Sequence, residues 1–197
     1  MKNQELNNPD ADRYANILYE KSYRLKQLIE DLIEASKVSS GNISVEYSKI
    51  NMRQLVIQAL GEFEERIENS GLDVKINVVE DVNIKADGKH MWRIFENLIT
   101  NAIKYSMKNT RLYIDICKDN NKGLFIIKNI TENPIDISVE HLSERFVRGD
   151  ESRTTEGSGL GLSITKSLAE LQAGSLKIEV DGDLFKATIE MQLWEEE

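Results

Sequence analysis

Two short segments contain residues that could bind a nucleotide together. The first, FENLITNAIKYS at 95–106, places Asn97, Asn101 and Lys104 at helical spacing, and the second, GSGLGLS at 157–163, has three glycines in alternation. Mg²⁺ prefers hard oxygen ligands and keeps several waters, so one Asn amide oxygen with phosphate oxygens is an adequate ligand set. Lys104 can contact a phosphate as a point charge. The two segments therefore predict a metal ligand opposite a phosphate-binding loop.

The glycine-rich segment has the features of an anion-binding loop. Gly157, Gly159 and Gly161 permit close backbone approach, and the apolar pattern that starts at Leu160 and Leu162 is typical of a following helix. The first N–H groups of a helix are available to a phosphate. The P-loop signature is absent and the glycines do not follow a strand, which argues against P-loop and dinucleotide-binding folds. Taken alone, this segment could also be a plain flexible hinge.

The asparagine-bearing segment has the pattern of an amphipathic helix that runs to about Tyr105, with Asp87 as its N-cap. Asn97, Asn101 and Lys104 share one face, with Tyr105 at its edge. The opposite face is apolar and should pack on a sheet; it consists of Phe95, Leu98, Ile99, Ala102 and Ile103. A merely solvated polar face is the alternative, but Asn is a poor helix former at exposed interior positions. The presence of two asparagines on this face therefore favours a binding role.

Composition limits the classes of protein to consider. The chain has 197 residues, 40% of them hydrophobic, which is enough for one good core and a small accessory element. Its formal net charge of -9 argues against a nucleic-acid partner, because phosphate neutralisation needs clustered Lys and Arg. Cys117 is the single cysteine, so no intrachain disulfide is possible. The sequence has no run of 18 apolar residues, and we expect a soluble chain of cytosolic type without direct membrane contact.

The N-terminal region, from about 10 to 38, is expected to form one long helix. Apolar or small residues follow the alternating steps of a coiled-coil seam, and turn-forming residues at 39–42 end the pattern. Such an apolar face needs a partner. Packing on its own domain is the alternative to a partner helix.

The rest of the chain predicts one α/β domain, because period-two strands alternate with helical patterns. Residues 130–160 lack periodicity except near 139–146, which is typical of a functional lid or a disordered loop. The expected strands are 45–47, 74–78, 82–86, 112–117, 124–129, 176–180 and 184–193, and the expected helices are 52–69, 88–105 and 160–173.

The motifs in this order resemble those of the ATP-binding catalytic domain of bacterial sensor histidine kinases, in the GHKL superfamily that includes the gyrase B subunit. FENLITNAIKYS resembles the N box, SERFVRG at 143–149 the F box, and GSGLGLS the second glycine box. The segment YANILYEKSYRLKQLIEDLIEASK at 14–37 is similar to the second helix of the dimerisation and phosphotransfer hairpin. The resemblance implies a two-layer sandwich of a mixed β-sheet and helices, the Bergerat-type ATP-binding fold, preceded by a long N-terminal helix.

The resemblance also implies domains and roles. Residues 1–40 would be a partial dimerisation and phosphotransfer helix, and 41–197 the ATP-binding domain with a lid at about 130–160. ATP and Mg²⁺ would be bound, with Asn101 on the metal and Asn97 in the metal and phosphate shell. Glu96 would lie beside the incoming histidine. The remaining ATP-binding positions would be Lys104, Tyr105, Asn129, Arg145, Phe146, Arg148, Gly157, Ser158, Gly159, Leu160, Gly161 and Leu162.

Three differences from the family pattern refine these expectations. Asn97 stands where gyrase-like relatives have a glutamate base, and an amide cannot accept a proton from water, which favours a kinase over a hydrolase. Asn129 occupies the position of the usual adenine-reading aspartate, so adenine binding is expected to be weaker. Neither His90 nor His141 has the flanking residues of a phosphoacceptor.

We therefore expect a catalytic fragment of a membrane-attached sensor kinase. It would transfer the γ-phosphoryl group of ATP to a histidine outside this chain. Its expected partners are the histidine-bearing helix, a response regulator and, in the full-length protein, a second copy. Two alternatives remain open: a degenerate module that binds nucleotide or dimerises without transfer, and a serine kinase of the anti-sigma type.

Overall fold

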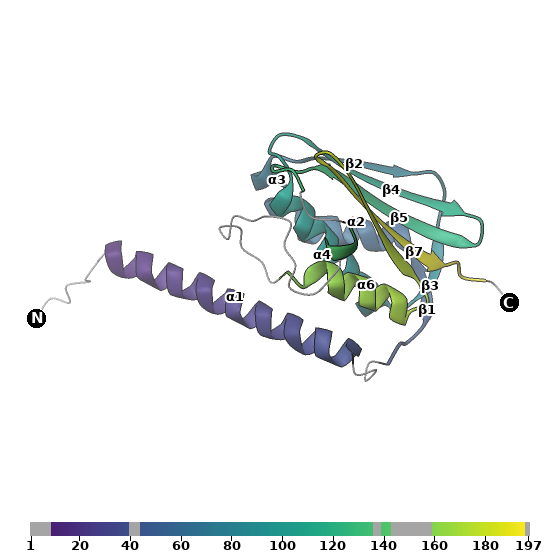
Figure 1. Ribbon diagram of the computed structural model, residues 1–197, viewed down its shortest axis with the longest axis horizontal. Helices are drawn as coiled ribbons and strands as arrows, with labels where there is room; N and C mark the ends of the chain where they lie inside the picture. The colour runs from purple at the N-terminus through teal and green to yellow at the C-terminus, as the bar shows by residue number, and fades with distance from the viewer. Residues whose placement is uncertain (1–8, 40–43, 136–138, 143–158, 196–197) are drawn as a thin grey trace, which may run out of the picture.

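The computed structural model describes residues 9–39, 44–135, 139–142 and 159–195 (Figure 1). A five-stranded sheet forms one layer of the α/β domain, in the strand order β2-β4-β5-β7-β6. Its strands are β2 (Asp73–Val78), β4 (Arg111–Asp119), β5 (Lys122–Ile130), β6 (Ser175–Asp181) and β7 (Leu184–Gln192). β2 pairs parallel with β4 and the other pairs are antiparallel, so the sheet is mixed, as expected.

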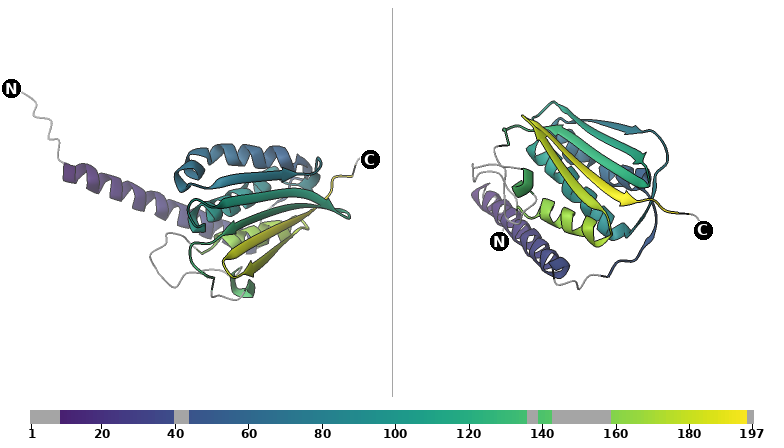
Figure 2. Two further views of the ribbon diagram at one scale, coloured as in Figure 1. Left: turned by 90° about the horizontal axis from the view of Figure 1, so that it is seen from above. Right: turned by 45° about the vertical axis from the view of Figure 1, so that its right-hand side comes forward.

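Helices form the second layer, on one face of the sheet (Figures 1 and 2). They are α2 (Met52–Glu62), α3 (Glu64–Ser70), α4 (Gly88–Tyr105) and α6 (Gly161–Leu171), and a short helix α5 spans Val139–Leu142. Alternate residues of the central strands point into the core, for example Leu112, Ile114 and Ile116 of β4, all fully buried. The apolar face of α4 packs on them, and the Phe95 ring lies 4.5 Å from that of Phe125 on β5. The two-layer fold is confirmed.

Two boundaries differ from the sequence predictions. The first strand, β1, spans Ser48–Asn51 rather than 45–47, because its register follows antiparallel pairing with β3 (Asn83–Ala86) in a separate two-stranded sheet. The helix expected at 52–69 is broken at Phe63, whose φ of -103° and ψ of 10° leave the helical region. Its N–H is shared between the carbonyls of Ala59 and Leu60. The break turns α3 so that Phe63 and Ile67 are both buried.

The other expected elements are observed within a few residues of their predicted bounds. Of the short helix expected at 139–146, residues 139–142 are helical, and 143–146 lie outside the described residues. Most of the lid predicted at about 130–160 also lies outside them.

The long helix α1 (Pro9–Ser39) lies beside α6, with its C-terminal end closest to the connection to β1 (Figures 1 and 2). Its expected seam faces away from the domain: Leu18, Leu25 and Leu32 are each more than half exposed. Within residues 9–39, 44–135, 139–142 and 159–195, no helix combines the length and apolar character that crossing a bilayer requires.

Candidate nucleotide-binding site

Helix α4 carries the asparagines, and its start is fixed by Asp87. The Asp87 carboxylate accepts hydrogen bonds from the backbone N–H of Lys89 at 2.9 Å and of Glu46 at 2.9 Å. The backbone N–H of Asp87 donates to the side-chain oxygen of buried Gln172 at 2.7 Å. Burial alone would raise the pKa of Asp87, but these backbone hydrogen bonds outweigh it and hold the pKa below its usual range. The predicted N-cap is confirmed, and it also joins α4 to the end of α6.

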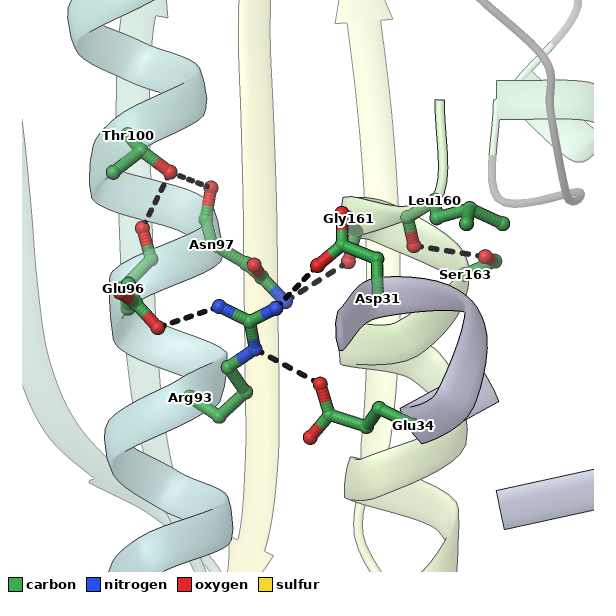
Figure 3. A network of polar contacts seen from close by, with 9 residues as sticks. All are labelled: Asp31, Glu34, Arg93, Glu96, Asn97, Thr100, Leu160, Gly161 and Ser163. Atoms are coloured by element: carbon green, nitrogen blue, oxygen red, sulfur yellow. Dashed lines mark hydrogen bonds and ion pairs between the residues drawn. The ribbon is translucent and has the colours of Figure 1, made fainter. Parts of the chain in front are cut away.

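The two motifs meet at a direct contact between α4 and α6. The Asn97 amide nitrogen donates to the carbonyl of Gly161 at 3.3 Å (Figure 3). Asn97 is only 7% exposed, so it is not part of a solvated polar face. One turn further along α4, the Thr100 hydroxyl donates hydrogen bonds to the backbone carbonyls of Glu96 and Asn97, at 2.6 and 3.2 Å. None of these hydrogen bonds uses the Asn97 side-chain oxygen.

The absence of a side chain at Gly161 leaves space beside both asparagines. A Cβ atom there would lie 3.6 Å from Nδ2 of Asn101 and 3.9 Å from Cγ of Asn97. These are ordinary contact distances, so a methyl group would fit but would occupy that space. Carbonyl and amide oxygens on this wall are hard donors of the kind that Mg²⁺ accepts. The residues present therefore fit a magnesium ion, which Asn97 and Asn101 would hold.

The C-terminal end of α4 brings Lys104 and Tyr105 together. The Lys104 ammonium donates to the Tyr105 hydroxyl at 2.7 Å and lies 4.4 Å from the centre of its ring. This end of the helix joins the end of β5, because the N–H of Met107 donates to the carbonyl of Ile130 at 2.9 Å. Asn129, the residue before Ile130, is 3% exposed. The adenine position proposed from the sequence therefore lies on the strand that meets this end of α4.

The remaining predicted site residues divide into two groups. Arg145, Phe146, Arg148, Gly157 and Ser158 lie outside the described residues.

Of the described group, Gly159 has a positive φ of 70°, which glycine adopts without strain. Leu160 is 2% exposed in the hydrophobic core and Leu162 packs against that core, so their backbone rather than their side chains would face a phosphate.

Comparison with known proteins agrees with this geometry. The family described as histidine kinase-, DNA gyrase B-, and HSP90-like ATPase matches residues 86–195, more than half of the chain. The chain belongs to this family. The match begins at the residue before Asp87 and contains both α4 and α6, the helices that carry the described residues of the candidate site.

The similar proteins include a sensor protein and histidine kinases. The probable sensor protein PcoS of Escherichia coli is 31% identical over 179 residues, which are 88% of this chain and 38% of PcoS. Histidine kinase AdeS of Acinetobacter baumannii has a similar fold, with a TM-score of 0.78 at 21% identity over 94% of this chain and 86% of that one. Histidine kinase ThkA, solved in complex with response regulator protein TrrA, gives a TM-score of 0.72 at 22% identity over 96% of this chain and 53% of that one. The chain thus spans well under half of its curated relative PcoS.

One cluster in this ATPase domain was missed from the sequence. Arg93, one turn before Asn97 on α4, donates to Glu96 at 2.7 Å, to Glu34 of α1 at 2.9 Å, and to Asp31 of α1 (Figure 3). Glu96, expected beside an incoming histidine, is therefore engaged in an ion pair. A possible signal was the i, i+3 spacing of Asp31 and Glu34, but charged residues at that spacing occur on most exposed helices.

Proposed function

We propose that this chain is the catalytic domain of a sensor histidine kinase, which transfers the γ-phosphoryl group of Mg-ATP to a histidine in another segment. The observation that carries the proposal is the identity of residue 97. Asn97 lies at the contact between the two ATP-binding motifs and is an amide, with no carboxylate that could deprotonate water. The names of PcoS, AdeS and ThkA support the same activity class.

The residues of the site hold and orient the nucleotide. Asn101 and Asn97 would hold Mg²⁺, which when bound neutralises phosphate charge and polarises the transferred group. Lys104, held by Tyr105, supplies a positive charge at the helix end. Asn97 fixes the spacing between α4 and α6 through the Gly161 carbonyl. Because phosphoryl transfer needs positioning and charge neutralisation more than acid–base chemistry, these roles suffice for a kinase.

The partners follow from the same proposal. ThkA was solved with a response regulator, and by analogy a response regulator would receive the phosphoryl group from the histidine. The exposed seam of α1 would pack on the helix that carries this histidine and on a second copy of the chain. Residues 1–40 would belong to this dimerisation unit and 41–197 to the ATP-binding domain. The full-length protein would be a membrane sensor whose catalytic domain lies in the cytoplasm.

The decisive experiment is calorimetric titration of the Asn101→Ala variant with ATP, with and without Mg²⁺. Wild type should bind more tightly with Mg²⁺, and Asn101→Ala should lose that dependence together with at least about tenfold in affinity, since a metal ligand is removed. Asn69→Ala on α3 is the matched control, because Asn69 is an exposed helical asparagine outside both motifs, and it should bind as wild type does. Unchanged magnesium-dependent binding in Asn101→Ala would overturn the site assignment.

Transfer is tested separately, with a supplied hairpin that contains an acceptor histidine. The expected product is an acid-labile phosphohistidine. Nucleotide binding without any transfer would instead identify a degenerate binding module. An acid-stable phosphoserine on a partner would identify the anti-sigma type of serine kinase.

A further inference from the structure

A single arginine joins α1 to the helix that carries the nucleotide site. Arg93 contacts three carboxylates, two on α1 (Asp31 and Glu34) and one on its own helix (Glu96), and its side chain is 22% exposed. Asp31 and Glu34 are 16% and 25% exposed, whereas the Lys26–Glu30 pair on the same helix is 68% and 55% exposed. The Arg93 contacts are thus shielded by the packing of α1 on the domain, unlike an ordinary surface pair.

The contact uses all three nitrogens of the Arg93 guanidinium. Nε, Nη1 and Nη2 of Arg93 each face a different carboxylate, which uses the fixed fork of the group. Burial alone would lower the pKa of Arg93, but the bonds to Glu96 and Glu34 raise it above its ordinary value. Arg93 stays charged at any pH at which the protein is folded. Without it, three carboxylates would face one another at the α1–α4 contact.

The large apolar residues of α1 contribute little to this contact. Leu25, Ile29, Leu32 and Ile33 are 48–58% exposed, and only Leu28 among these neighbouring large apolar residues is half-buried. A cavity of about 580 Å³ separates the last turns of α1 from the start of α4. Its wall is mainly polar and includes Glu30 and Lys37 of α1. The contact between α1 and α4 therefore depends more on the Arg93 ion pairs than on close apolar packing.

The start of α4 is also incompletely satisfied on the cavity side. Nδ1 of His90 is buried yet has no hydrogen-bond partner among the described residues, and it lies 3.8 Å from the nearer carboxylate oxygen of Asp87. His90, which also lines the cavity, thus adds no side-chain hydrogen bond through Nδ1 to the α1–α4 contact among the described residues.

We propose that Arg93 is a positioning residue that docks α1 on the nucleotide-binding domain through Asp31 and Glu34. Because Arg93 and Asn97 lie one turn apart on one helix, the dock fixes where α1 runs relative to the site wall. The proposal goes beyond phosphoryl transfer, since it concerns the placement of α1 with or without nucleotide.

The test measures the distance between α1 and the domain in the full chain. Spin labels are placed at Ser22→Cys on α1 and Gln58→Cys on α2, both exposed positions, in a Cys117→Ser background. Ser22 is twelve residues from Glu34, about 18 Å along a helix. A small rotation at the dock therefore moves the label by several ångströms. Pulsed dipolar spectroscopy should give one narrow distance in the chain that retains Arg93.

Three variants decide the outcome. Arg93→Gln should broaden the distance distribution about twofold or more, because the three carboxylates separate once they lose their shared cation. Arg66→Gln, the same change at an exposed arginine of α3, should leave it narrow. Charge reversal, with Arg93→Glu combined with Asp31→Lys and Glu34→Lys, should restore the narrow distance. A narrow distance in Arg93→Gln, or no restoration by charge reversal, would overturn the proposal.

These measurements are made without nucleotide, so they separate the dock from the proposed function. Calorimetry on the same variants reports ATP binding independently. A chain that binds no ATP but loses docking in Arg93→Gln would overturn the function and support the dock. A chain that binds ATP and keeps α1 in place in Arg93→Gln would do the reverse.

Discussion

The two halves of α4 face the rest of the protein with different chemistry. The first half uses charges: Asp87 caps the helix and Arg93 binds three carboxylates. Toward α6, the second half uses neutral amides: Asn97 contacts the Gly161 carbonyl and Asn101 lines the space beside it. Both halves rest on the same buried row of apolar side chains. The difference therefore arises from what each half must contact, since the packing beneath them is shared.

The comparison shows how a site for a polyanion is built next to a charged interface. A carboxylate beside a triphosphate would repel it. A cation held close to the carboxylate offsets that negative charge. Amides carry no charge and can offer oxygen to a metal or N–H to a carbonyl. In this protein the carboxylates are collected around Arg93, one turn away from the amides (Figure 3). The ion pair thus shields the site from its acidic neighbours.

The largest expected effect comes from removing the support that both halves share. Phe95→Ala should lower the free energy of unfolding by about 3–5 kcal/mol, because Phe95 is fully buried against Phe125 and its loss leaves a cavity. Urea denaturation followed by circular dichroism measures this. Ile57→Ala, at a position that is 50% exposed on α2, is the control and should cost much less. Similar losses in the two variants would contradict the packing described for α4.

The core of α4 and its cap could be predicted from the sequence, because both depend on local signals. The 3.6-residue period identified the apolar face, and a single Asp before a Gly identified the N-cap. Helical spacing placed Asn97, Asn101 and Lys104 on one face but left a solvated face as the alternative. The resemblance to a known family added Asn129 as a proposed adenine position, which no local pattern indicates.

The Arg93 cluster could not be predicted, because it depends on where α1 packs. Asp31 and Arg93 are 62 residues apart, and nothing local selects their partnership. The break at Phe63 could not be predicted for a similar reason. Helix propensity continues through 52–69, and the helix is interrupted only because Phe63 and Ile67 are both buried in the core. Tertiary packing overrode the local pattern at both places.

A smaller change sharpens the comparison at the amide half. Gly161→Ala should reduce ATP affinity about tenfold, about 1.4 kcal/mol, because its methyl group would occupy the space beside Asn97 and Asn101. Stability should not fall, since the added Cβ meets only ordinary contacts and alanine favours a helix over glycine. Isothermal titration and urea denaturation of one preparation would show the two effects with opposite signs.

Gly61→Ala provides the matched control for this substitution. Gly61 is in α2, and a Cβ there meets no atom within 4 Å. This variant should gain up to about 1 kcal/mol of stability and keep wild-type affinity. If Gly161→Ala bound ATP as tightly as Gly61→Ala does, the gap between the asparagines and α6 would have no part in binding.

The smallest expected effect concerns the charged half and depends on pH. Asp87→Ala should cost about 1 kcal/mol at pH 7, the usual worth of an N-cap. The folded pKa of Asp87 is lowered, so its contribution is complete above the unfolded value of about 3.9 and is lost as pH falls through the folded pKa. The difference between variant and wild type should therefore shrink below about pH 4.

Asn51→Ala isolates the part of this effect that comes from charge. Asn51 caps α2 through its side-chain oxygen, which accepts from the N–H of Gln54 at 3.0 Å, and it does not titrate. Its loss should cost a similar amount at pH 7 and the same amount at pH 3.5, measured by urea denaturation at each pH. A difference for Asp87→Ala that stayed constant over this range would mean that the carboxylate acts only as a neutral acceptor, and the charged half of α4 would then begin at Arg93.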